Sequence, residues 1–135
     1  MTAKEWLNRA RTIDGELEAL YETREMMVAQ LTKATQTLTG DTVQAPKDPH
    51  KFDDLGELAL EIERAVKTCH KIKSETLAVI MRIENSTLRR LLVLRYLNGH
   101  TWEEIAVRMN YSWRQVHRLH GRAIIEVAEV LKCRQ

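Results

Sequence analysis

Apolar residues recur at alternating spacings of four and three along the first 38 residues of the chain. The series comprises Trp6, Ala10, Ile13, Leu17, Leu20, Arg24, Met27, Leu31, Ala34 and Leu38, of which Arg24 is the one misfit. This is the heptad pattern of a coiled coil, in which one stripe of each helix is buried against a partner helix. It predicts a helix over 3–38, which at 1.5 Å per residue is a rod of roughly 54 Å. Thr2 and Glu5 have the spacing of a capping box that would start this helix.

A second heptad series follows a segment that has no helical periodicity. Residues 39–53 contain one glycine and two prolines, which predicts a loop. The second series comprises Leu55, Leu58, Ile62, Ala65, Cys69, Ile72, Thr76, Val79 and Ile83. It predicts a helix over 54–84, with Asp54 and Glu57 suited to cap its start. Two heptad helices joined by a loop of this length most simply pair as an antiparallel hairpin.

Several apolar residues of the two long helices fall outside both heptad stripes. They are Met26, Val28, Leu60, Val66 and Leu77. A pair of helices buries little surface by itself, and exposed apolar patches mark faces that another domain or chain covers. The pattern favours burial of these residues against another copy of the chain over burial against the C-terminal region. Whether such a homo-oligomer is a dimer or larger stays open.

Charge is distributed unevenly along the chain. Residues 1–85 contain 12 Lys and Arg against 15 Asp and Glu, a net charge of −3. Residues 86–135 contain 9 against 4, a net charge of +5. Such an asymmetry predicts that the C-terminal end of the chain faces a polyanion.

The cysteine content and the hydropathy indicate the compartment. Cys69 and Cys133 lie far apart without a CxxC spacing, so we expect free thiols and a reducing, cytoplasmic setting in the host cell. The N-terminus has no apolar signal core, and no run of 18 apolar residues occurs, so we expect no membrane partner.

Three shorter helices are predicted in residues 85–135. Asn85 or Ser86 can cap the first, which would run to about Asn98 and end at Gly99. Its inward residues would be Leu88, Leu91, Leu92 and Tyr96.

Two capping boxes open the other two helices. Thr101 is followed by Glu104, and Ser112 is followed by Gln115. Asn110 lies between the two helices, at a turn position that often needs left-handed backbone. This is the layout of a helix-turn-helix, whose second helix enters the major groove of DNA. The predicted fold is therefore all-α, with an antiparallel coiled-coil hairpin over 1–84 followed by a trihelical helix-turn-helix domain over 85–135.

The last helix combines an apolar stripe with a basic face. The stripe comprises Val116, Leu119, Ala123, Ile124 and Val127. The residues predicted to read DNA bases, on the opposite face, are Trp113, Arg114, His117 and Arg118. Arginine is the usual bidentate partner of guanine O6 and N7. The residues predicted to contact DNA phosphates are His100, Thr101, Trp102, Arg108 and Arg122.

Catalytic and metal-binding arrangements are not found in the sequence. It offers no nucleophile with a base, no glycine-rich phosphate loop and no paired carboxylates in a context that would form a pocket, which predicts a protein that is not an enzyme. Cys69 with His70 and His117 with His120 are pairs that nothing nearby completes. We therefore expect no metal and no cofactor, a packed thiol at Cys69, and His120 at the edge of the reading face.

Residues 91–124 resemble region 4 of bacterial sigma factors, which reads the promoter −35 element. The matching residues are LRY at 94–96, Gly99, EIA at 104–106, Ser112, Val116 and RA at 122–123. Nearly the whole chain is also similar to a family of small phage and prophage proteins, through MTAKEWL at 1–7, GDTVQ at 40–44 and YSWRQVHRLHGRA at 111–123. The sigma resemblance implies that the base-reading residues named above contact the promoter element.

Together these resemblances imply a phage-type transcriptional regulator that binds double-stranded DNA, with RNA polymerase as a candidate partner. The chain has no counterpart of the sigma region that melts the −10 element, so initiation would depend on another protein. Two alternatives stay open. One is a DNA-packaging component akin to a small terminase subunit, and the other is an adaptor that binds RNA polymerase without DNA.

Overall fold

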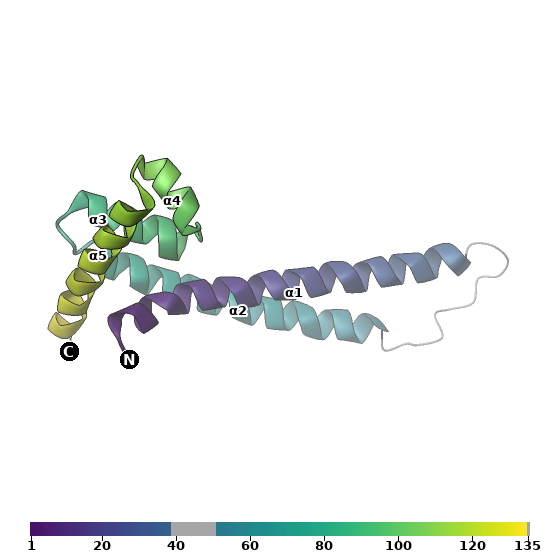
Figure 1. Ribbon diagram of the computed structural model, residues 1–135. Coiled ribbons are helices and arrows are strands. Elements are labelled where there is room, and N and C mark those ends of the chain that lie inside the picture. Colours follow the sequence, from purple (N-terminus) through teal and green to yellow (C-terminus); the bar gives the residue numbers. More distant parts are fainter. Residues whose placement is uncertain (39–50, 135) are drawn as a thin grey trace. The chain divides into compact units, whose positions relative to one another are not determined.

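The computed structural model describes residues 1–38 and 51–134, and every element in these ranges is helical (Figure 1). The elements are α1 (Ala3–Leu38), α2 (Lys51–Ile80), α3 (Ser86–Leu92), the π-helical turn η1 (Val93–Leu97), α4 (Trp102–Met109) and α5 (Trp113–Cys133). The predicted all-α class is confirmed for these residues. Most of the predicted loop, 39–50, lies outside them. No helix in the described ranges combines the length and the apolar character that crossing a bilayer requires.

The chain divides into two compact units. Unit 1 comprises Met1–Asp14 and Cys69–Gln135, and unit 2 comprises Gly15–Thr68. Each long helix therefore contributes residues to both units. The domain boundary predicted between residues 84 and 85 is not where these units divide, and it stays a prediction.

In unit 2, burial follows the heptad positions. The buried and half-buried members of the series are Leu17, Leu20, Met27, Leu31, Leu55, Leu58, Ile62 and Ala65. Arg24, the charged member, is exposed, and its guanidinium carbon lies 5.1 Å from the centre of the Tyr21 ring. The charge thus stays in water while the helix keeps its apolar stripe.

The bounds of α2 differ from the prediction. It begins at Lys51 rather than at residue 54, so that Asp53 and Asp54 fall in its first turn, where carboxylates interact favourably with the helix dipole. It ends at Ile80 rather than at residue 84. The Asn85 side chain caps α3 by accepting from two backbone N–H groups, and this requires extended backbone at Asn85 (φ −73°, ψ 113°). The chain must therefore leave the helix before Asn85.

Complete capping boxes start α1 and α5. The Thr2 backbone N–H donates to Glu5 Oε2 (2.8 Å), and the Glu5 N–H donates to Thr2 Oγ1 (3.2 Å). In the same way the Ser112 N–H donates to Gln115 Oε1 (2.8 Å), and the Gln115 N–H donates to Ser112 Oγ (3.2 Å). Both boxes were predicted, and both are confirmed.

Both parts of unit 1 contribute to its main core. The buried members are Leu7, Val79, Ile80, Ile83, Leu88, Leu92, Tyr96, Ala123 and Val127. A second cluster in the same unit comprises Leu91, Leu94, Ile105, Met109 and Val116. The inward positions predicted for the helix after residue 85 are all buried. Three of the main core residues, Leu7, Val79 and Ile80, belong to α1 and α2, and Ile83 follows the end of α2.

Polar contacts in unit 1 fix the relative direction of the starting turns of α1 and the closing turns of α2. Arg9 pairs with Glu75 (3.6 Å), and Asp14 pairs with Lys73 (2.8 Å). The Cys69 thiol also donates to Asp14 Oδ1 (3.6 Å). From Arg9 to Asp14 the residue numbers on α1 rise, whereas those of their partners on α2 fall from Glu75 to Lys73 and Cys69. These helix ends are therefore antiparallel. Burial raises the pKa of the Cys69 thiol, which confirms a packed thiol at this position.

The helix predicted over 85–98 is α-helical only in α3 and continues as the π-helical turn η1. In η1 the backbone widens, so that the Asn98 N–H donates to the Val93 carbonyl (2.9 Å) and the His100 N–H donates to the Leu94 carbonyl (3.0 Å). Widened turns of this kind leave neighbouring carbonyl groups without their usual helical partners.

Cationic side chains of α1 and α2 donate hydrogen bonds to backbone carbonyls in and after η1. Arg11 Nη1 donates to the carbonyls of Arg95 (3.0 Å) and His100 (3.5 Å). Lys73 Nζ donates to the carbonyl of Leu97 (3.2 Å). The last residues of α2 and the first of α1 thus stabilise the end of the helix that precedes α4.

The turn between α4 and α5 has the predicted left-handed residue. Asn110 has φ 58° and ψ 43°, and its N–H donates to the carbonyls of Ala106 and Val107. Left-handed backbone costs most side chains roughly 1–2 kcal/mol, and asparagine and glycine tolerate it better.

Replacing Asn110 therefore has opposite expected effects, depending on the substituent. Asn110→Ala should lower the free energy of unfolding by about 1 kcal/mol, whereas Asn110→Gly should leave it unchanged or slightly higher. Urea unfolding followed by circular dichroism measures both. Asn98→Ala is the matched control, because Asn98 has right-handed backbone (φ −94°) and an exposed side chain. Equal stability of the Asn110→Ala and Asn110→Gly variants would contradict the left-handed turn.

Candidate nucleic-acid interface

The capped start of α5 presents an indole and two arginines to solvent. Trp113 is 58% exposed, and Arg114 and Arg118 are also exposed. The buried stripe of the same helix comprises Val116, His120, Ala123 and Val127. Within residues 1–38 and 51–134, the side chains of Arg114, Arg118 and Arg122 make no ion pair. Their positive charge is therefore available to an external anion.

Two further arginines lie near the end of α4, before the turn that leads into α5. Arg108 is exposed, as predicted for a phosphate contact. Arg90 on α3 is exposed as well, and its Nη2 donates to the Arg108 backbone carbonyl (3.1 Å). The sequence did not single out Arg90, because only the packing of α3 against α4 brings it to this place.

The start of α4 is less favourable for an anion. The Glu104 N–H donates to Thr101 Oγ1 (3.2 Å), but the Glu104 carboxylate bonds to His100 Nδ1 (2.7 Å) and not to the Thr101 N–H. The predicted capping box is therefore half formed, because His100 takes the carboxylate. This hydrogen bond lowers the pKa of Glu104. A phosphate at His100 or Thr101 would meet the carboxylates of Glu103 and Glu104, so the geometry favours the α5 arginines and Arg108 as contacts.

Four side chains form a chain of ring contacts from η1 through α4 to the start of α5. The Arg95 guanidinium carbon lies 4.2 Å from the centre of the Trp102 ring. The centres of the Trp102 and His117 rings are 4.6 Å apart, and those of His117 and Trp113 are 4.0 Å apart. We call Arg95, Trp102, His117 and Trp113 the aromatic stack. His117 and Trp102, predicted to contact DNA, are thus half-buried within it.

The sequence predicted His120 at the edge of the reading face, and this prediction is wrong. His120 lies in the core. It is 8% exposed, and its Nε2 lies 2.7 Å from the Tyr96 hydroxyl oxygen. Burial raises the pKa of Tyr96 and lowers that of His120 to about 4, so both groups are neutral at pH 7. The spacing of Val116, His120, Ala123 and Val127 is that of one helix face, so helical periodicity is compatible with this burial. The partner of the imidazole could not be predicted, because Tyr96 lies on another element.

Acidification is expected to destabilise the fold through His120. The pKa of this imidazole falls from an ordinary value of 6.5 to about 4 on folding. Between these values the unfolded chain binds a proton that the folded chain does not. The stabilisation is therefore present above pH 6.5 and lost as the pH falls to 4, by up to about 3 kcal/mol.

Urea unfolding between pH 7 and pH 4 measures this loss. The His120→Gln variant keeps an amide that can bond to Tyr96 but does not titrate, so its stability should fall less over the same range. Parallel pH profiles for the two proteins would contradict the buried neutral imidazole.

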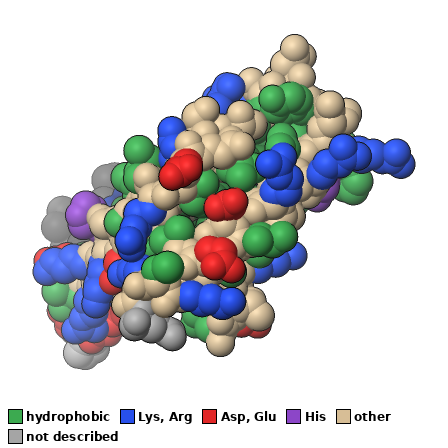
Figure 2. Space-filling model, turned by 90° about the vertical axis from the view of Figure 1, so that its left-hand side faces the viewer, with side chains coloured by type: hydrophobic (Ala, Val, Ile, Leu, Met, Phe, Trp, Pro, Cys, Tyr) green, Lys and Arg blue, Asp and Glu red, His purple; other side chains and the backbone are tan. Residues whose placement is uncertain are grey.

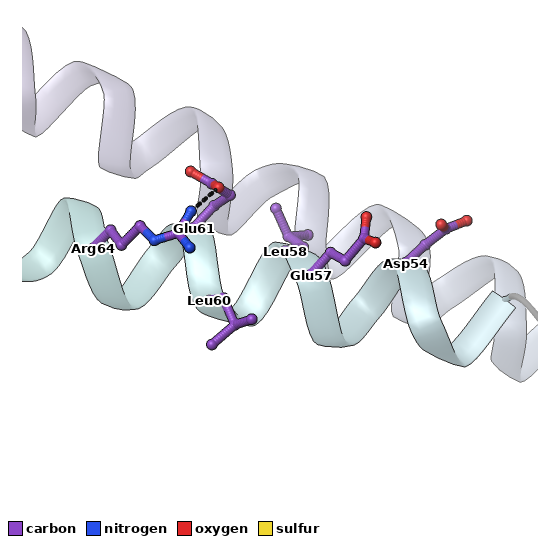
Figure 3. A pocket seen from close by; sticks show the side chains of 6 residues that line it. All are labelled: Asp54, Glu57, Leu58, Leu60, Glu61 and Arg64. Carbon is purple, nitrogen blue, oxygen red and sulfur yellow. Dashed lines mark hydrogen bonds and ion pairs between the residues drawn. The ribbon is translucent and has the colours of Figure 1, made fainter.

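Neither a metal-binding group of side chains nor the surface pocket of unit 2 forms an alternative site among the described residues. Within residues 1–38 and 51–134, no three His, Cys, Asp or Glu side chains are grouped to hold a metal ion. Figure 3 shows a surface pocket in unit 2 whose lining residues all belong to α2: Asp54, Glu57, Leu58, Leu60, Glu61 and Arg64. Arg64 is already paired with Glu61 (2.6 Å), and no second element contributes a side chain.

No protein-family model matches the chain, and neither a curated protein nor a solved structure is significantly similar to it. The function must therefore be inferred from the geometry of unit 1 and the chemistry of its side chains.

Proposed function

We propose that this protein binds double-stranded DNA, with α4 and α5 acting as a helix-turn-helix and α5 as the recognition helix. The observation that carries this proposal is the capped start of α5, where Trp113, Arg114 and Arg118 are exposed. Recognition helices meet base edges with the side chains of their first turns. A rigid helix start with two unpaired guanidiniums and an indole suits that task.

The exposed cations divide into two roles by position. Arg114 and Arg118 are four residues apart on one face of α5, so both can point into the same groove. Each can bond to guanine O6 and N7. Arg108 at the end of α4 and Arg122 further along α5 flank that face and suit phosphate contacts, which orient a protein on the duplex without reading sequence.

We further propose that the long helices pair as an antiparallel coiled coil and that this hairpin assembles copies of the chain. The five apolar residues singled out from the sequence as lying outside the heptad stripes are exposed: Met26, Val28, Leu60, Val66 and Leu77. Figure 2 draws the left-hand side of Figure 1, and on that face too apolar side chains reach the surface among charged ones. A second copy would cover such residues and present two reading helices to the DNA, as dimeric helix-turn-helix proteins do.

In this proposal the protein is a transcriptional regulator of the phage type and not an enzyme. Its net charge of +5 over residues 86–135 supports a polyanionic partner. The resemblance of residues 91–124 to sigma region 4 supports promoter DNA as the target and RNA polymerase as a second partner.

Salt dependence of binding tests the proposal. Fluorescence anisotropy of a labelled random duplex should show affinity falling roughly tenfold between about 50 and 200 mM salt, if about two phosphates are contacted. Arg108→Ala should make this dependence shallower by about one phosphate while leaving the fold intact. Binding that does not change with salt, or no binding by the folded protein, would contradict the proposal and favour an adaptor without DNA.

A further inference from the structure

We propose that His117 does not read bases but positions Trp113, which is the DNA-contacting member of the aromatic stack. The inference rests on the proposed DNA binding and reassigns one residue within it. His117 thereby becomes a positioning residue, because it acts on DNA through another side chain.

The surroundings of the His117 ring support this assignment. The ring lies between the indoles of Trp102 and Trp113, with centre-to-centre distances of 4.6 and 4.0 Å. Its Nε2 atom is buried and has no hydrogen-bond partner within the described part of the chain. A nitrogen enclosed in this way does not reach a base edge while the stack is intact, whereas the exposed face of Trp113 does.

The inner end of the aromatic stack is firmly held. Arg95 lies over Trp102, and its Nη1 donates to the His100 carbonyl (3.1 Å). The Trp102 ring also meets the buried His120 ring edge-on, with centres 4.6 Å apart. Arg95 and His120 both contact Trp102 and so restrict its ring. The His117 ring packs against this restricted indole, and it can therefore fix the position of Trp113.

This support has a consequence for binding. Trp113 is 58% exposed, and an unsupported indole at a helix start would sample several rotamers. Ordering a free side chain on association costs roughly 0.5–1.5 kcal/mol, so an indole already held in place binds more tightly. Its apolar surface suits a thymine methyl group or a sugar edge.

Variants of His117 separate positioning from base reading. His117→Phe keeps a ring between the indoles and removes both nitrogens, so DNA affinity should stay within about twofold of the wild type. His117→Ala removes the ring, and the affinity should fall about three- to tenfold, as it should for Trp113→Ala. Both losses should also alter preference at the same base pair. A loss in His117→Phe as large as that in His117→Ala would overturn the proposal, as would an unchanged His117→Ala.

A measurement without DNA tests the support itself. The chain contains three tryptophans, so protein labelled with 5-fluorotryptophan gives three fluorine resonances, assignable with single Trp→Phe variants. In His117→Ala the Trp113 resonance should move towards that of free fluorotryptophan, and in His117→Phe it should stay shifted. An unmoved resonance in His117→Ala would overturn the positioning role. Failure of the wild type to bind duplex would instead contradict the proposed function, and with it the DNA contact of Trp113.

Discussion

Replacing Arg114 and Arg118 by alanine is expected to abolish the preference of the protein for one DNA sequence over another. A bidentate contact from arginine to guanine contributes about 1–3 kcal/mol of discrimination, so each variant should lose roughly 5- to 150-fold in affinity for the preferred duplex. Affinity for unrelated duplexes should change far less, since the phosphate contacts proposed for Arg108 and Arg122 would remain. Competition anisotropy with preferred and scrambled duplexes measures the ratio.

Lys132→Ala is the matched control for these variants. It removes one positive charge from the same helix, about 27 Å from Arg114 at 1.5 Å per residue. Lys132 is exposed and lies 4.0 Å from the Glu129 carboxylate. Both affinities should stay within about twofold of the wild type in this variant. If Arg114→Ala and Lys132→Ala weaken binding to all duplexes alike, α5 contributes charge only and does not read sequence.

Leu7→Ala is expected to destabilise unit 1 by about 2–5 kcal/mol, because it leaves a cavity where the surroundings cannot fully collapse. Leu7 is 0% exposed and packs in one core with residues from α2, α3 and α5. The loss should appear as a lower urea midpoint, with α4 and α5 unfolding in the same transition. Ile125→Ala, at a residue that is 65% exposed in the same unit, should change stability by less than about 0.5 kcal/mol. Similar effects of the two variants would contradict the shared core.

The same packing predicts that residues 85–135 do not fold as an isolated fragment. Removing the rest of the chain takes away Leu7, Val79, Ile80 and Ile83 from the main core. It also removes Arg11 and Lys73 from the carbonyls around η1. A well-dispersed amide spectrum from the fragment would show that the helix-turn-helix is independent of the long helices.

Features that depend on neighbouring residues could be predicted from the sequence. The capping boxes at Thr2 and Ser112 form between residues three apart, so a short pattern contains both partners. The left-handed turn at Asn110 and the burial of heptad positions in the long helices likewise depend on residues that are close in the sequence.

Features that depend on packing between elements could not be predicted in this way. The contact between Arg11 and Arg95 joins residues on α1 and η1, and the bond between Tyr96 and His120 joins η1 and α5. His120 shares its helix face with Val116, Ala123 and Val127, but the sequence does not show that the Tyr96 hydroxyl is there to bond to a buried imidazole. The same limit applies to the candidate site. The exposure of Arg114 and Arg118 follows from the apolar stripe opposite, whereas the enclosure of His117 needs Trp102 from α4.

Selection from a random duplex library, by the wild type and by the Arg114→Ala/Arg118→Ala double variant in parallel, tests sequence-specific DNA binding most directly. The wild type should enrich one motif containing guanines at the positions that the two arginines read. The double variant, if folded by circular dichroism, should bind duplex but enrich no motif. A wild-type protein that is folded and enriches no motif would contradict the proposed regulator.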